Sequence, residues 1–171
     1  MATGLRIDGL VTAYGAVQVL HGVSLDAPAG QITCVMGRNG VGKTTLLRSV
    51  MGQIRATSGG VNLADQDLSR APAHLRARAG IALVPQGREI FPKLTVRENL
   101  EIGFSARGSI DQSAVEAGMT MFPILRDFAK RNGGDLSGGQ QQQLAIARAL
   151  VGKPVSYTHL RAHETKANLV C

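Results

Sequence analysis

Tryptophan is absent from this chain, and Phe, Trp and Tyr together make up only 4% of it. Leu, Val, Ile and Ala must therefore fill any core. The two cysteines, Cys34 and Cys171, are too few for a disulfide framework, and the apolar stretch around Cys34 predicts a buried, unreactive thiol. No run approaches the roughly 18 apolar residues of a membrane span, and the first residues carry no apolar signal core. These absences predict a cytoplasmic chain, or one on the cytoplasmic face of a membrane.

Charge of one sign dominates. The chain has 19 Lys and Arg residues against 12 Asp and Glu residues, which gives a formal net charge of +7. Such an excess suits nucleic acid, anionic lipid or an acidic ligand. The basic residues are scattered, however, and no aromatic residues alternate with them to form a platform for stacked bases. We therefore predict a solvated basic surface and no nucleic-acid partner.

The stretch from Gly37 to Thr45 fits the phosphate-binding P-loop pattern G-x-x-x-x-G-K-[ST]. The short apolar stretch at 31–36 predicts a buried strand before it, and residues 45–51 predict a helix after it. This order aims free backbone N–H groups and the positive helix end at one point. We predict that nucleotide phosphates bind here, at Gly37, Arg38, Asn39, Gly40, Val41, Gly42, Lys43, Thr44 and Thr45.

The residue types in the P-loop follow from this task. The three glycines admit backbone dihedrals that a side chain would forbid, and they leave room for phosphate oxygens. Lys43 supplies a mobile positive charge for the β- and γ-phosphates. The Thr44 hydroxyl is the expected Mg²⁺ ligand, and Thr45 can donate to an inner phosphate. The alternative is a glycine-rich turn with a chance lysine, but a random chain of this length would show the pattern less than about once in a hundred tries.

The rest of the chain predicts an α/β fold. Residues 5–26 predict short antiparallel strands with turns at Gly9, Gly15 and Gly22. Gln86 follows a predicted strand at its carboxyl end, where open α/β sheets place ligand contacts. The other predicted elements are strand 61–64, helix 72–79, strand 81–84, a helix from the capping box Thr95–Glu98 to about Phe104, helical residues 111–131 broken at Pro123, and a helix over 141–151.

A second glycine-bearing helix start is Leu136-Ser-Gly-Gly-Gln140. Ser137 can cap the helix that follows, and Gly138 and Gly139 leave its N-terminal amides accessible. By itself, this segment is a second anion-ready helix start that lacks a lysine.

Together with the P-loop, LSGGQ makes the chain resemble the nucleotide-binding subunit of ATP-binding-cassette (ABC) transporters over roughly residues 3–154. The stretches 36–47 and 84–92 are similar to importers for branched-chain amino acids, and most to their urea or short-chain-amide branch. The resemblance implies a P-loop NTPase fold over residues 1–154. It comprises a parallel core sheet, an N-terminal antiparallel β section and a helical section that carries LSGGQ.

The resemblance also implies roles. Tyr14 would stack on adenine, although a turn-packing tyrosine is the alternative. The P-loop would hold ATP and Mg²⁺, and Gln86 would touch the metal or the attacking water and relay occupancy to the membrane subunit. In a head-to-tail dimer, the second helix start would contact the γ-phosphate of ATP bound to the other subunit, through Leu136, Ser137, Gly138, Gly139 and Gln140.

The implied partners are a second ABC subunit, in this class a paralogue, integral membrane permease subunits and, indirectly, a periplasmic solute-binding protein. The chain would then lie on the inner face of the cytoplasmic membrane. Two alternatives remain open: a soluble ABC-type ATPase that acts on nucleic acid or ribosomes, and an ATP-binding protein without catalysis.

The tail departs from the family. Members continue after the LSGGQ helix with an apolar strand ending in Asp-Glu and, later, a switch histidine. Residues 155–171 contain only one carboxylate, Glu164, which we do not assign as catalytic base. They resemble translated adapter sequence, so we predict that native sequence stops near Pro154 and that the tail is foreign or disordered. ATP hydrolysis would be lost, and the strand at 32–36 would keep an unpaired apolar edge.

Overall fold

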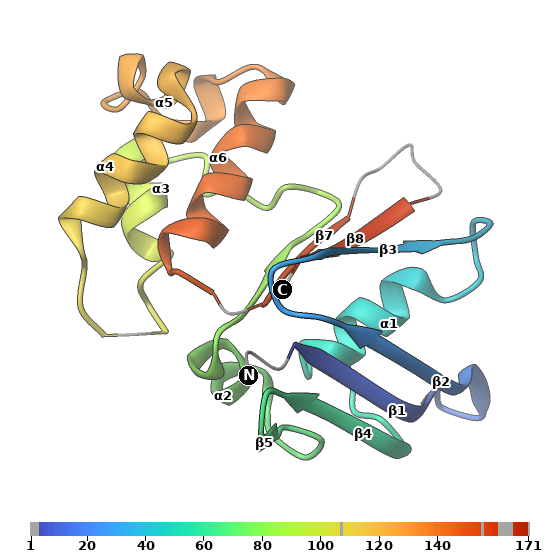
Figure 1. The fold of residues 1–171 in the computed structure, drawn as a ribbon. Coiled ribbons are helices and arrows are strands. Elements are labelled where there is room, and N and C mark those ends of the chain that lie inside the picture. Colours follow the sequence, from blue (N-terminus) through green and yellow to red (C-terminus); the bar gives the residue numbers. More distant parts are fainter. Residues whose placement is uncertain (1–3, 107, 155, 161–165, 171) are drawn as a thin grey trace. The chain divides into compact units, whose positions relative to one another are not determined.

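The structure is a computed structural model that describes residues 4–106, 108–154, 156–160 and 166–170. The chain forms two compact units (Figure 1). The first unit comprises residues 1–83 and 155–171, and the second comprises residues 84–154. Glu164 lies outside the described residues.

An antiparallel sheet forms one part of the first unit. Its strands are β1 (Leu5–Tyr14), β2 (Val17–Ala27), β4 (Ser58–Leu63) and β5 (Gln66–Asp67), in the order β2-β1-β4-β5. Gly15 forms the predicted turn between β1 and β2. The predicted turns at Gly9 and Gly22 are wrong, because both residues lie inside continuous strands where the pairing register shifts. Their φ angles of +53° and +78° mark them as bulge positions that favour glycine.

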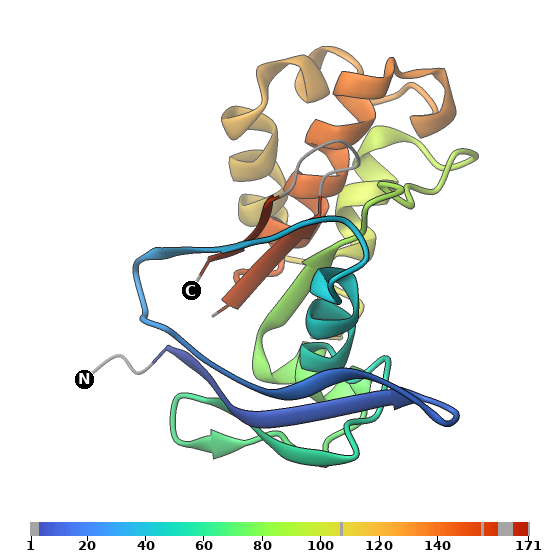
Figure 2. The same ribbon diagram turned by 90° about the vertical axis from the view of Figure 1, so that its right-hand side faces the viewer.

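Helix α1 (Lys43–Val50) packs on this sheet, as Figure 2 shows. Leu47 and Val50 are fully buried in the same apolar cluster as Leu10 and Leu20 of the strands. Each such side chain contributes about 1.5–3 kcal/mol on burial. A buried hydrogen bond of 3.0 Å between the hydroxyls of Thr12 and Ser49 joins β1 to α1. The sheet thereby holds the helix that begins at the P-loop.

The second sheet has the order β3-β8-β7-β6, with β3 (Ile32–Met36), β8 (Lys166–Val170), β7 (Ser156–Leu160) and β6 (Ile81–Val84). β8 pairs antiparallel with both β3 and β7, where the sequence predicted a parallel core sheet. The prediction of an unpaired edge at β3 is therefore wrong, whereas the assignment of residues 155–171 as a foreign or disordered tail stays a prediction. An edge strand presents unpaired N–H and C=O groups, and here β8 pairs with those of β3.

Strand β3 is less buried than its apolar sequence predicted. The side chains of Ile32 and Met36 are 73% and 67% exposed. Cys34 is exposed as well, so the prediction of a buried thiol is wrong. Alternation of the exposed residues with half-buried Thr33 and Val35 shows that only one face of β3 is covered.

Helix α2 (Ala73–Ala79) completes the first unit and confirms the predicted helix at 72–79. Pro72 stands at its N-cap position. Gly80 ends it with a φ of 107°, a left-handed conformation that favours glycine.

The second unit is helical. It contains α3 (Val96–Ile102), α4 (Gln112–Met121), α5 (Pro123–Asp127), a 3₁₀ turn η1 (Gly133–Asp135) and α6 (Gly138–Val151). The capping box at the start of α3 and the break at Pro123 are confirmed. The shared core consists of apolar side chains from α3 to α6, among them Val96, Leu100, Val115, Leu125 and Leu144. A Cβ at Gly103 would collide with the Arg148 carbonyl oxygen, so glycine lets α3 approach α6 closely.

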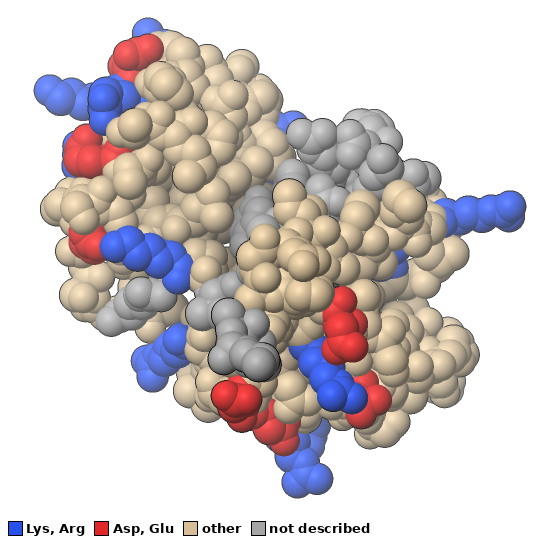
Figure 3. Space-filling model, viewed as in Figure 1, with Lys and Arg blue, Asp and Glu red and all other residues tan. Residues whose placement is uncertain are grey.

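On the face drawn in Figure 3, Lys and Arg side chains lie singly or beside Asp and Glu, rather than in one patch. Within the described ranges, no helix is both long and apolar enough to cross a bilayer.

Candidate functional site

The P-loop connects β3 to α1 through a backbone that depends on glycine. Gly40 and Gly42 have φ angles of 83° and 96°, in the left-handed region. A Cβ on Gly42 would lie 3.0 Å from Leu20 Cδ2 and 3.3 Å from Val19 Cγ1. The loop thus packs directly on side chains of β2, and a side chain at residue 42 would crowd them and strain the backbone.

The first turn of α1 is left open. Its N-cap is Gly42, no side chain caps it, and no acidic residue stands in the turn. The amide of Leu46 donates to the Gly42 carbonyl oxygen at 2.8 Å, which starts the helical ladder. Amides before that point have no intrahelical acceptor, and they lie at the positive end of the helix. Such a helix start binds phosphate oxygens well.

Lys43 adds a full positive charge at this point. Its half-buried ammonium donates to the carbonyl oxygens of Gly37 at 2.7 Å and Arg38 at 2.8 Å. These bonds hold the ammonium against the loop while one of its three N–H donors remains for another acceptor. The arrangement fits a polyphosphate, because phosphate oxygens can be bound by the amides and the ammonium together.

Thr44 is half-buried and Thr45 is buried at the same helix start. The Thr44 hydroxyl offers one of the oxygen ligands that Mg²⁺ prefers, and phosphates and water usually supply the others. In the part of the chain that the structure describes, no three His, Cys, Asp or Glu side chains gather as a metal site. Mg²⁺, when bound, would neutralise phosphate charge beside Thr44.

Tyr14 is the last residue of β1, and its side chain is 50% exposed. Exposure leaves ring surface for stacking on a planar ligand. Among the described residues, no hydrogen bond or ring contact joins Tyr14 to the P-loop. Its role in adenine binding stays a prediction.

The second predicted helix start is capped. Ser137 Oγ accepts from the Gln140 amide at 3.4 Å, and the Ser137 amide donates to Gln140 Oε1 at 2.8 Å. Ser137, Gly138 and Gly139 are exposed, whereas Leu136 is buried in the core. Three of the five predicted contact residues therefore face solvent. Leu136 and the Gln140 side chain instead hold the helix start in shape.

Gln86 lies two residues after β6 and is exposed. The loop that follows Gln86 is hydrogen-bonded to α6. Arg88 Nη1 donates to Gln141 Oε1 at 2.9 Å, and a Cβ on Gly138 would lie 3.2 Å from that nitrogen. Arg148 Nη2 donates to the Glu89 carbonyl oxygen at 2.8 Å.

Sequence reasoning missed these two arginines. Arg88 and Glu89 have φ angles of 64° and 47°, which are rare for residues with side chains, so the contacts hold a strained loop. Burial lowers the pKa of Arg148, which also lies over the Phe91 ring. The only available signal was an arginine two residues after Gln86, and no spacing rule connects it to α6.

The predicted site residues fall into two sets. Tyr14 and the P-loop belong to the first unit, and Gln86 and the LSGGQ segment belong to the second. Each set combines backbone amides at a helix start with a nearby cation. Each can bind an anion chemically, but only the P-loop set has a lysine ammonium inside the loop.

Comparison with known proteins agrees with this geometry. The model of the family described as ABC transporter matches residues 20–157. The chain is 40% identical to the high-affinity branched-chain amino acid transport ATP-binding protein BraG of Pseudomonas aeruginosa, covering 88% of this chain and 65% of the relative. It is 42% identical to the probable branched-chain amino acid transport ATP-binding protein LivF of Archaeoglobus fulgidus, covering 87% and 64%.

Solved structures agree as well. A dimeric ATP-binding cassette in a post-hydrolysis state, bound to ADP and Pi, matches with a TM-score of 0.77 at 27% identity and covers 88% of this chain and 70% of that one. The chain spans just under two thirds of the length of the two curated relatives. The predicted P-loop NTPase fold class is confirmed. The chain belongs to the ABC transporter family, in which it is an ATP-binding domain.

Proposed function

We propose that this chain is the ATP-binding part of an importer for branched-chain amino acids or for urea and short-chain amides. The main observation is the Lys43 ammonium bonded inside a glycine loop at the uncapped start of α1. The amino-acid assignment is supported by the names of the two relatives. The urea assignment is supported by the sequences of residues 36–47 and 84–92. Enzymes encoded by neighbouring genes would discriminate between an amino-acid importer and a urea importer.

In the proposed mechanism, ATP lies between two protomers. Gly37–Thr45 of one chain would bind the phosphates and Thr44 would hold Mg²⁺. Gln86 would contact the Mg²⁺ or the attacking water, and Tyr14 would stack on adenine. Ser137, Gly138 and Gly139 of the second ABC subunit cover the γ-phosphate. Exposure of these three residues supports the proposal, because a capped helix start facing solvent is available to a partner's ligand.

The proposed partners are a second, paralogous ABC subunit and integral membrane permease subunits, with a periplasmic solute-binding protein acting through them. The chain would be peripheral on the inner face of the cytoplasmic membrane. Co-purification with a membrane subunit supports this assignment. A salt-sensitive shift of nucleic acid would instead support the soluble alternative.

We further propose that this polypeptide does not hydrolyse ATP. No Asp-Glu pair follows the helix that LSGGQ begins. A general base alone is worth roughly 10²–10⁴ in rate, and the metal-binding aspartate is missing as well. Purified chain should show negligible ATPase activity. Resequencing across codon 154 tests the linked proposal that residues 155–171 are foreign.

Equilibrium binding of ATP tests the nucleotide site. Lys43→Ala removes the ammonium and the one N–H donor that remains for a phosphate oxygen, a charge-assisted contact worth about 1.5–3 kcal/mol, so affinity should fall at least about tenfold. Arg48→Ala is the matched control, because Arg48 is an exposed cation near the other end of the same helix. Equal affinity of the Lys43 variant and the control would refute the proposal.

A further inference from the structure

The first unit contains a hollow that is lined by basic side chains and lies away from the P-loop. Its volume is about 870 Å³. Gly52, two residues beyond α1, belongs to its wall. An eight-residue helix is roughly 12 Å long, so α1 separates this hollow from the P-loop at its other end. The polar side chains that line it are Arg55, Thr57, Ser58, Ser69, Arg70 and Arg76.

Arg76 is the most buried of the three arginines that line the hollow. It is only 3% exposed, and its guanidinium donates to the carbonyl oxygens of Ser49, Val50, Ser69 and Ala71 at 2.8–3.0 Å. The bonds to Ser49 and Val50 cap the last turn of α1. Within the described ranges, no carboxylate forms an ion pair with Arg76, although the charge of Asp67 acts on it from farther away. A buried cation whose hydrogen-bond partners are all neutral favours a further anion nearby.

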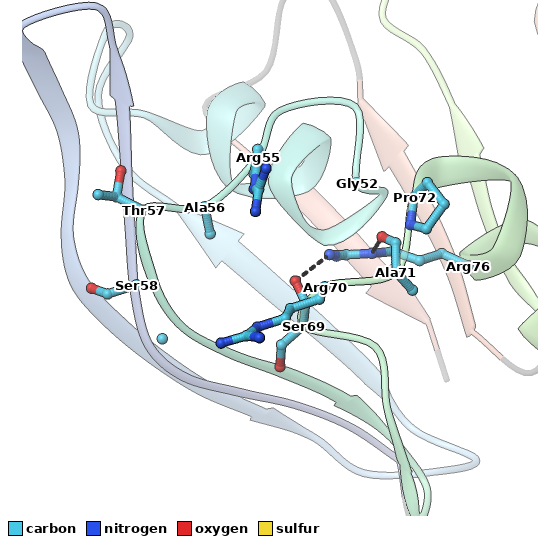
Figure 4. A pocket seen from close by; sticks show the side chains of 11 residues that line it. Gly52, Arg55, Ala56, Thr57, Ser58, Ser69, Arg70, Ala71, Pro72 and Arg76 are labelled. Atoms are coloured by element: carbon cyan, nitrogen blue, oxygen red, sulfur yellow. Dashed lines mark hydrogen bonds between the residues drawn. The ribbon is translucent and has the colours of Figure 1, made fainter.

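Arg55 and Arg70 reach the hollow from different sides. Arg55 extends from the segment between α1 and β4, and Arg70 from the segment before α2 (Figure 4). Both side chains are exposed, and among the described residues neither makes a hydrogen bond or an ion pair. Their guanidinium groups are therefore available to a ligand.

Asp67, whose charge acts on Arg70 and Arg76, already has hydrogen-bond partners of its own. Asp67 Oδ1 accepts from the Ser69 amide at 2.8 Å and from the Ser69 hydroxyl. The hydroxyl bond, followed by the amide bond, lowers the pKa of Asp67, with smaller contributions from Arg70 and Arg76. Asp67 does not belong to the wall, and no other carboxylate is among the described residues that line the hollow.

We propose that this hollow binds a small phosphate-bearing molecule, up to the size of a nucleotide. A guanidinium group can donate two parallel hydrogen bonds to two oxygens of one phosphate, and the hydroxyls of Thr57 and Ser58 add uncharged donors. A volume near 870 Å³ lies in the range of small-molecule sites, roughly 300–1,000 Å³. The site is independent of the nucleotide site at the P-loop.

Pyrophosphate binding to the full chain, measured by calorimetry in low salt, tests this proposal. Lys43→Ala serves as the background, because it weakens anion binding at the P-loop. In that background, Arg55→Gln with Arg70→Gln should weaken pyrophosphate binding at least about tenfold. The control pair, Arg48→Gln with Arg78→Gln, removes the same charge from exposed residues outside the hollow and should change affinity less than about twofold.

Two results would overturn the proposal. One is the same loss from both pairs of substitutions, which would indicate only a general charge effect. The other is the absence of pyrophosphate binding once Lys43 is replaced, which would leave the P-loop as the only anion site. A thermal melt of each variant verifies folding. ADP as a second probe separates a nucleotide ligand from an inorganic one, since a nucleotide site binds ADP more tightly than pyrophosphate.

Discussion

The starts of α1 and α6 carry similar glycine-rich sequences but satisfy their backbone amides differently. At α1, no side chain caps the first turn, and Lys43 lies against the loop carbonyls. At α6, Ser137 and Gln140 form a capping box, and the nearby cation is Arg88, which is bonded to Gln141.

This difference separates two kinds of anion site. Because its amides are uncapped and a charge lies within the loop, the α1 start can bind a polyphosphate by itself. At the α6 start, the Gln140 amide already donates to the Ser137 cap, so fewer amides remain for an anion. This helix start therefore suits a ligand that is already bound to another surface. In the proposed ATP sandwich, the two helix starts would therefore have different tasks.

The largest effect is expected from glycine substitutions at these starts. Gly42→Ala places a Cβ against Val19 and Leu20 at a φ of 96°, so it should destabilise the chain by about 1–3 kcal/mol and abolish ATP binding. Gly139→Ala meets nothing within 4 Å and should change stability by less than about 0.5 kcal/mol. Urea unfolding measures both. Equal losses would contradict the contrast.

Loss of the α6 cap should have a smaller effect. Ser137→Ala removes the acceptor of the Gln140 amide and should destabilise the chain by about 0.5–2 kcal/mol. Ser137→Asp keeps a capping oxygen and should restore stability. Its negative charge would repel a γ-phosphate, however, so any ATP-dependent association should still be lost. Recovery of association along with stability would show that Ser137 only caps the helix.

The Arg88–Gln141 contact tests whether the loop after Gln86 depends on α6. A double-mutant cycle with Arg88→Ala and Gln141→Ala in urea should give a coupling free energy of about 0.5–1.5 kcal/mol. Arg88→Gly should be less destabilising than Arg88→Ala, because glycine adopts a φ of 64° without strain. A coupling near zero would mean that the contact does not stabilise the loop.

Acid should weaken the capped helices of the second unit. The Ser113 hydroxyl, followed by Lys153, lowers the pKa of Asp111 at the start of α4, and Thr95 lowers that of Glu98. Because both folded-state values lie below the ordinary ones, the ionised caps stabilise the fold fully above about pH 5 and lose that contribution as pH falls below about 4.

The variant Asp111→Asn should flatten the fall in melting temperature between pH 5 and pH 3. Asp8→Asn is a suitable control, because Asp8 is exposed and makes no ion pair among the described residues. An unchanged slope in Asp111→Asn would contradict the assignment. The start of α1 has no titrating cap, so its contacts should not contribute to this slope.

Local signals in the sequence predicted much of the fold. The capping box at Thr95, the cap at Ser137, the end of the helix at 72–79 and the P-loop each depend on residues within one or two turns. What the sequence did not predict depends on distant partners. Gly9 and Gly22 resemble turns until two strands are paired across them, and an apolar strand such as β3 is buried only where another element covers it.

The site shows the same limit. The glycines and Lys43 are specified by a local motif, whereas Arg88 and Arg148 reach their partners 53 and 59 residues away in the chain. No spacing within a single element predicts such pairs. The direction of β8 beside β3 is a further long-range property.

Amide NMR of this chain during an ATP titration, with the second ABC subunit present at equal amounts and at two protein concentrations, tests the central claim most directly. The amides of Gly40–Thr45 should shift at both concentrations with the same dissociation constant. Those of Gly138 and Gly139 should shift only at the higher concentration, because their ATP comes from another protomer. Shifts at Gly138 and Gly139 that do not depend on protein concentration, or none at Gly40–Thr45, would contradict the account.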